Sequence, residues 1–101
     1  MRRGTTPTLT LLVNAHIETW TCYLTLEDGT NEVTFEDDRI TKTTVDQKTQ
    51  LEVTLTQEET LAMPVGNVEV QVRAIKNGKA IATNIKTLPI ERILKEGVIS
   101  E

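Results

Sequence analysis

A nucleophile activated by an imidazole is the first chemistry that the sequence could support, because it contains one histidine, His16, and one cysteine, Cys22. Catalysis would need the imidazole beside Cys22 or Ser100. Cys22 alternates with Trp20 and Leu24 on an apolar face, which predicts a buried and inert thiol. One histidine and one cysteine also cannot complete a tetrahedral zinc site in a monomer. We therefore interpret His16 as a loop residue without a catalytic role.

Carboxylates gather at two places in the chain. Glu36, Asp37 and Asp38 are consecutive, and hard cations such as calcium bind clustered oxygens. The spaced pattern of a calcium loop is missing, so we interpret these residues as a solvated turn. Glu58 and Glu59 are explained as negative charge at the start of a helix. Paired-carboxylate hydrolysis would also need a cleft, which short strands and brief loops hardly build. The sequence predicts no metal, no other cofactor and no enzymatic activity.

Charge and glycine spacing argue against further classes of protein. The net charge of -4 argues against a dedicated nucleic-acid binder, which needs a positive field to neutralise phosphates. The five glycines are isolated, so none forms a phosphate-binding loop. No run approaches the roughly 18 apolar residues of a membrane span, and Leu11–Val13 is too short for the core of a signal peptide. We expect no membrane association and no secretion by a signal peptide.

The elements that must position these residues are strands. Threonine is frequent, and its β-branched side chain suits the exposed face of a sheet. Apolar and polar residues alternate strictly in 20–26, 51–56 and 68–74, which is typical of strands with one buried face. In 79–88 the same period places Ile81, Thr83, Ile85 and Thr87 on one face. Seven strands are predicted, over residues 8–14, 18–27, 31–36, 39–45, 51–56, 67–76 and 79–88.

Turn and cap signals connect these strands. Asp28-Gly29 and Asn77-Gly78 favour two-residue type I′ turns, and therefore tight antiparallel hairpins. Thr56 and Glu59 have the spacing of a capping box. We predict about one helical turn, from Gln57 to Ala62, with Leu61 buried beneath it.

These elements favour an all-β fold, an immunoglobulin-like antiparallel β-sandwich of about seven strands with one short helical turn. A small, partly open barrel is the alternative. The chain is expected to form a single domain over residues 1–101. The cysteine pair of antibody domains is absent, so any kinship would be of architecture.

The two ends of the chain fall outside the strand pattern. Residues 1–7 form an N-terminal arm, and residues 90–101 form a C-terminal segment that could be helical or extended. This segment either closes its own core or docks on a neighbouring protein. Unpaired strand edges could also accept a strand from a partner. The residues predicted for docking are the apolar ones of the segment: Ile90, Ile93, Leu94, Val98 and Ile99.

A sugar-binding module is the alternative function. Sandwich domains that bind carbohydrate usually present exposed aromatic rings, and this chain has few. Trp20 belongs with the core face, which leaves Tyr23 as the ring expected to be exposed. A host-surface glycan is the ligand that this alternative predicts.

Several segments together resemble a known group of proteins: residues 1–8, the strand 51–55 leading into 56–60, the strand 68–73 and the closing residues 93–99. The chain resembles small proteins encoded in phages and prophages of Gram-positive bacteria, found among tail or baseplate genes. Its strand layout is also similar to the N-terminal sandwich domain of the upper baseplate protein family.

The resemblance implies a non-enzymatic phage structural or assembly protein, a tail- or baseplate-associated adaptor. Its partners would be other phage virion proteins or a second copy of itself, with no nucleic acid and no membrane. It would be found in the virion or, during assembly, in the cytoplasm of the host bacterium. No functional residue is carried over from the group.

Overall fold

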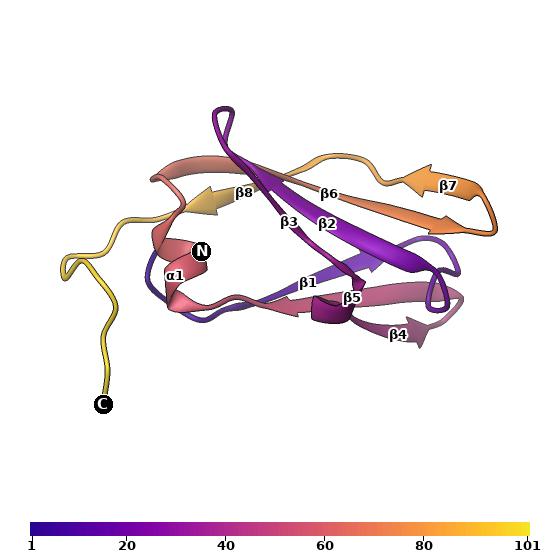
Figure 1. Ribbon diagram of the computed structural model, residues 1–101, viewed down its shortest axis with the longest axis horizontal. Coiled ribbons are helices and arrows are strands. Elements are labelled where there is room, and N and C mark those ends of the chain that lie inside the picture. Colours follow the sequence, from indigo (N-terminus) through magenta and orange to yellow (C-terminus); the bar gives the residue numbers. More distant parts are fainter.

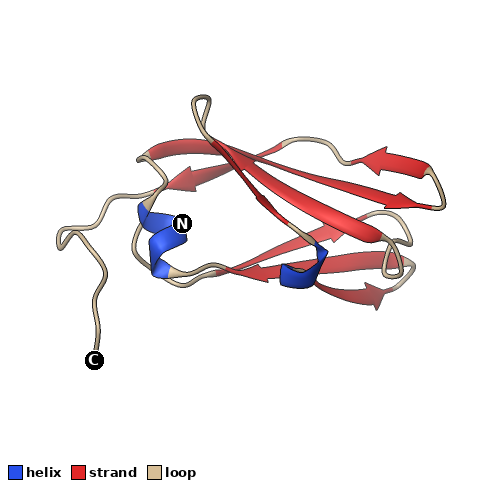
Figure 2. Cartoon of the chain, viewed as in Figure 1, coloured by secondary structure: helices blue, strands red, loops and turns tan.

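The computed structural model describes all residues, 1–101, and shows a sandwich of two antiparallel sheets (Figure 1, Figure 2). This confirms the predicted fold class. The chain forms eight strands: β1 (Thr8–Val13), β2 (Thr21–Glu27), β3 (Glu32–Phe35), β4 (Thr41–Val45), β5 (Lys48–Thr54), β6 (Gly66–Lys76), β7 (Lys79–Ala82) and β8 (Lys86–Ile90). A 3-10 turn, η1 (Asp37–Arg39), links β3 to β4, and a helix, α1 (Gln57–Leu61), links β5 to β6.

The strand order is that of an immunoglobulin-like domain. One sheet has the order β1-β5-β4, and the other has β3-β2-β6 with β7 and β8 both paired to β6. In immunoglobulin terms, β1, β5 and β4 take the places of strands B, E and D. β3, β2 and β6 take those of C′, C and F, while β7 and β8 share that of G. No strand occupies the place of A beside β1, so β1 is an edge strand.

The core lies between the sheets and follows the predicted two-residue period. On β2, Cys22, Leu24 and Leu26 are buried, and so are the matching positions of β5 and β6. Trp20 lies just before β2 and packs against the core without being fully buried. No helix of the chain is long and apolar enough to cross a membrane.

One of the two predicted tight turns is confirmed. Asn77 and Gly78 both have positive φ and join Lys76 directly to Lys79, as a type I′ turn requires. The prediction for Asp28-Gly29 is wrong in turn type, because Glu27 pairs with Glu32 and leaves a four-residue loop. The Asp28 carboxylate accepts hydrogen bonds from the backbone amides of Thr30 and Asn31, at 2.8 and 2.7 Å. These two bonds stabilise the wider loop.

The last predicted strand, residues 79–88, is interrupted. The prediction that Ile81, Thr83, Ile85 and Thr87 share one face is therefore wrong. The pairing to β6 shifts by one residue between β7 and β8, as a bulge produces. Thr83 makes this bulge, because its hydroxyl accepts the hydrogen bond from the Val72 amide at 3.0 Å. The shift exchanges the two faces. Ile85 is therefore 58% exposed, whereas Ile90 is buried.

Helix α1 begins as predicted, with both halves of the capping box present. The Thr56 hydroxyl accepts from the Glu59 amide at 3.2 Å, and the Glu59 carboxylate accepts from the Thr56 amide at 2.8 Å. The buried residue of the helix is Thr60, not Leu61. The Thr60 hydroxyl donates to the Thr5 carbonyl at 2.9 Å, so the helix is held to the N-terminal arm by a hydrogen bond as well as by packing.

Candidate functional site

The predicted docking residues lie on a C-terminal segment that contains no helix: Ile90 ends β8, and residues 92–101 are irregular with bends at 94, 95 and 97. Its first part is tied to the body. The Glu91 amide donates to the Met1 carbonyl at 2.6 Å, and the Arg3 amide donates to the Glu91 carbonyl at 3.1 Å. The N-terminal arm thus pairs in parallel with the residue that follows β8.

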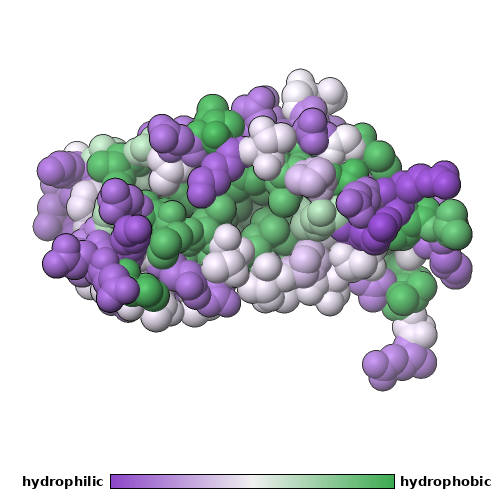
Figure 3. Space-filling model, turned by 180° about the vertical axis from the view of Figure 1, so that it is seen from behind, coloured by the Kyte–Doolittle hydropathy of each residue, from purple (hydrophilic) through white to green (hydrophobic).

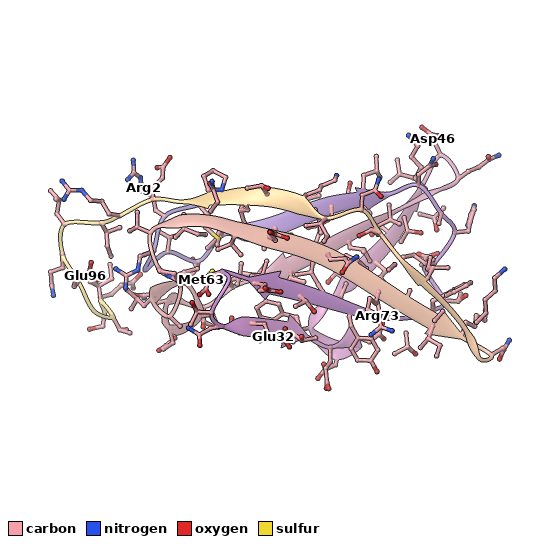
Figure 4. All side chains as sticks on the ribbon, turned by 90° about the horizontal axis from the view of Figure 1, so that it is seen from above. Arg2, Glu32, Asp46, Met63, Arg73 and Glu96 are labelled. Atoms are coloured by element: carbon pink, nitrogen blue, oxygen red, sulfur yellow. The ribbon has the colours of Figure 1, made fainter.

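Arg3 is the residue that joins the arm, the helix and the C-terminal segment. Its guanidinium donates to the carbonyls of Leu61 and Met63, each at 2.8 Å, and binds both carboxylate oxygens of Glu96 at 2.9 and 3.0 Å. The arginine therefore satisfies free carbonyls at the end of α1. Figure 4 shows Glu96 at the same end of the molecule as the arm residue Arg2 and far from Asp46 at the β4–β5 turn.

The predicted docking residues divide into two groups. Ile90 is buried at the end of β8, and Ile93 is half-buried against Gly4 and Leu61. Gly4 has φ +70, which favours glycine, and a Cβ built there would lie 2.8 Å from the Ile93 Cδ1 atom and would displace the end of that side chain.

The second group is exposed. Leu94 is 88% exposed, Val98 54% and Ile99 57%. Beyond the contact of Glu96 with Arg3, this part of the segment is held by Gln57 of α1, whose side-chain amide exchanges two hydrogen bonds with the backbone of Ile99, at 2.9 and 3.0 Å. In Figure 1 the segment projects from the sandwich beside α1. Of the residues predicted for docking, Leu94, Val98 and Ile99 are therefore accessible.

A second accessible region is the side of the sandwich between β1 and β8. Leu9 and Leu11 point toward the core but are only partly buried there, and Leu12 is 47% exposed. Figure 3, seen from behind, shows hydrophobic residues in a hollowed band along the middle of this face. A groove of about 360 Å³ opens at one end, between residues 12–15 and residues 81–84, where β7 ends and the bulge begins. We call this region the open side.

The residues considered for catalysis do not form a site together. His16 is exposed, whereas Cys22 is fully buried, and burial raises the pKa of its thiol. No group of three or more histidine, cysteine and carboxylate residues could hold a metal ion.

Asp37 has a structural role, because its carboxylate links the start of β2 to β4. Its Oδ1 accepts from the Cys22 amide at 2.9 Å and from the Lys42 ammonium at 2.5 Å. Burial by itself would raise the pKa of Asp37, but these hydrogen bonds outweigh it and hold the pKa below its ordinary value. Lys42 also donates to the Trp20 carbonyl, so the pair closes one end of the sandwich.

A second ion pair fixes helix α1 to η1, the 3-10 turn that connects β3 to β4. Arg39 of η1 makes two hydrogen bonds to the Glu59 carboxylate, at 2.9 and 3.0 Å, and its guanidinium lies 5.1 Å from the centre of the Phe35 ring. The hydrogen bonds from Arg39 lower the pKa of Glu59 despite partial burial, with help from the Thr56 amide. Glu59 is therefore both a capping residue and a partner of Arg39.

Tyr23 lies on the outer face of β2, as predicted, and is 37% exposed. Its partner across the ladder to β6 is Arg73, whose place on the sheet is marked in Figure 4.

In comparisons with known proteins, no protein-family model and no curated protein matched the chain.

Sequence reasoning did not single out the open side as a candidate region. The signal that could have found it is the segment Thr8–Val13, a strand with no charged residue and no proline.

Proposed function

We propose that this chain is a non-enzymatic structural or assembly protein of a phage particle, a tail- or baseplate-associated adaptor that acts through protein–protein contacts. Its place would be the virion or the cytoplasm of the host bacterium during assembly. The observation that carries the proposal is the exposure of Leu94, Val98 and Ile99 on a segment fastened to the body at its base. The resemblance of the terminal and strand segments to small phage proteins supplies the setting.

The attachment of the segment suits an adaptor. Ile93 and Glu96 hold its base against Gly4 and Arg3, so the segment leaves the body in a defined direction. Docking of its three exposed apolar side chains would remove them from water, and burial of a Leu or Ile side chain contributes roughly 1.5 to 3 kcal/mol. A pre-oriented segment also loses less conformational entropy on binding than a free tail would.

The test uses the tagged full-length chain and the tail and baseplate proteins dissociated from a purified phage of the bacterium that encodes it. The variant changes Leu94, Val98 and Ile99 to serine. A matched control changes Val45, Val65 and Ile75 to serine, because these are also exposed apolar residues but lie elsewhere. We expect one identified virion protein to bind the wild type and the control alike, and the variant at least about tenfold less. Equal binding of all three proteins would contradict the proposal.

Binding to a host-surface glycan remains the alternative, favoured by the exposed ring of Tyr23 beside Arg73. Loss of binding to cell-wall sugars in Tyr23→Ala, with retention in the triple serine variant, would support the glycan function over the adaptor function.

A further inference from the structure

The free edge of β1 offers an unused set of backbone hydrogen-bonding groups. The Leu55 amide donates to the Pro7 carbonyl at 2.9 Å, in register with the pairing of Thr8 to Thr54. Hydrogen-bonded pairs alternate along an antiparallel ladder, so the odd-numbered residues of β1 bond to β5. The even-numbered residues turn their N–H and C=O groups to the free edge: Thr8, Thr10 and Leu12. No other strand lies beside this edge.

The other sheet edges carry features that discourage pairing, and β1 does not. Natural edge strands are protected by charged side chains or proline. The sequence of β3 contains Glu32, that of β4 contains Lys42 and that of β7 contains Lys79. β8 has both a lysine and Pro89. β1, with the sequence TLTLLV, has neither a charge nor a proline.

The apolar residues of β1 are also incompletely covered. Leu9 and Leu11 face the core, yet both are only partly buried, because no strand lies beyond β1 on the open side. A strand added to this edge would satisfy the free backbone groups and cover these two side chains.

We propose that β1 is the interface of a two-fold symmetric homodimer, in which the β1 strands of two copies pair antiparallel about an axis at Thr10. This inference rests on the proposed role in protein contacts and names one partner. The two sheets that contain β1 then become one continuous sheet. A second copy is the occupant because its β1 brings an uncharged edge, whereas every other edge strand of the chain contains a charged residue.

The register follows from the geometry of the edge. Only the even-numbered residues have free groups, so Thr10 pairs with its own copy and Thr8 pairs with Leu12. Leu9 then lies across from Leu11, and the apolar rows of both copies join on the same face of the sheet. An axis at Leu11 would require residue 14, which lies in the bend after β1. The Thr10 axis uses strand residues alone.

The experiment measures the mass of the full chain by sedimentation equilibrium from micromolar to sub-millimolar concentrations. We expect a concentration-dependent dimer for the wild type. Thr10→Lys places two like charges opposite one another and should weaken the dimer at least about tenfold. Thr43→Lys is the control, since Thr43 is an exposed threonine on β4, the other edge of the same sheet. Mixing Thr10→Lys with Thr10→Glu should restore the dimer.

A second measurement does not depend on affinity. Thr10→Cys should form a disulfide-linked dimer on oxidation, because Cα atoms of hydrogen-bonded antiparallel pairs lie about 5.5 Å apart. Thr43→Cys should not, and Cys22 is buried and does not compete. A wild type that stays monomeric, a Thr10→Lys variant that dimerises like wild type, or equal cross-linking of both cysteine variants would each overturn the inference. Binding of a virion protein by monomeric Thr10→Lys would leave the proposed function intact.

Discussion

Individual side chains hold this small sandwich closed at its ends, where strand pairing stops. Arg3 connects the arm to α1 and to Glu96, and Arg39 connects η1 to the same helix through Glu59. Arg39 binds the Glu59 carboxylate through two guanidinium nitrogens, whereas Arg3 divides its nitrogens between two backbone carbonyls and Glu96. These contacts fix the helix and the base of the C-terminal segment without a disulfide.

The ion pair at Glu59 predicts a pH dependence of stability. The folded-state pKa of Glu59 is lowered, so its contribution is present above the unfolded pKa of about 4.3 and is lost as pH falls through the folded pKa. Glu59→Gln keeps the capping geometry but removes the charge. We expect it to lower the free energy of unfolding by about 0.5 to 1 kcal/mol at pH 7, since the pair is partly exposed.

Urea unfolding of the wild type and of Glu59→Gln at pH 7 and pH 3 measures this effect. The difference in the free energy of unfolding between the two proteins should shrink at the lower pH. The control is Glu58→Gln, because Glu58 lies beside Glu59 in the helix and its side chain has no partner there. An equal loss in the two variants would show that Arg39 does not act through Glu59.

Gly4 gives a second prediction at the scale of one residue. Gly4→Ala must place a side chain at φ +70 and displace the Ile93 side chain, so we expect a loss of about 1 to 2 kcal/mol. Gly29→Ala also has positive φ but meets no atom within 4 Å. Hydrogen exchange of residues 91–96 should accelerate in Gly4→Ala and stay unchanged in Gly29→Ala. Unaltered exchange in both variants would show that Gly4 does not position the segment.

At the scale of elements, the two-residue period found the strands, and local chemistry decided their interruptions. The Asn77-Gly78 turn and the capping box at Thr56 were predictable because each depends on neighbouring residues alone. The wider loop after Asp28 was not, since its carboxylate satisfies two amides beyond the expected turn. The bulge at Thr83 was missed because it depends on a hydrogen bond from a residue on β6.

The bulge predicts a specific effect of Thr83. Thr83→Val keeps the shape of the side chain but leaves the Val72 amide without its acceptor. We expect a loss of about 1 to 2 kcal/mol in thermal or urea unfolding. Thr87→Val serves as the control, because Thr87 is an exposed threonine of the neighbouring β8. Equal effects of the two substitutions would argue that the hydroxyl does not stabilise the bulge.

At the scale of the whole molecule, the fold leaves two regions uncovered, the end of the C-terminal segment and the free edge of β1. The sequence indicated an apolar C-terminal segment, but not where it divides into buried and exposed parts, because that depends on the packing of Ile93 against Gly4. The free edge of β1 depends on strand order, which alternation within single strands does not encode. Fold class was therefore predictable, whereas the uncharged sequence of Thr8–Val13 indicates an unprotected strand but not that this strand lies at an edge of its sheet.

The division of the segment predicts effects of different size on the stability of the isolated chain. Ile90→Ala should lower the free energy of unfolding by about 2 to 4 kcal/mol, because Ile90 is only 3% exposed. Changing Leu94, Val98 and Ile99 to serine should alter it by no more than about 0.5 kcal/mol. Urea unfolding measures both. A large loss in the serine variant would mean that these residues close the protein's own core.

Hydrogen–deuterium exchange, measured on the chain alone and in complex with a virion protein captured in the binding test of the proposed function, tests the central claim most directly. We expect amides of residues 94–99 to become protected in the complex, while those of the β4 edge, 41–45, exchange as before. Protection confined to the sheet face around Tyr23, with residues 94–99 unchanged, would contradict the claim that the C-terminal segment is the docking surface.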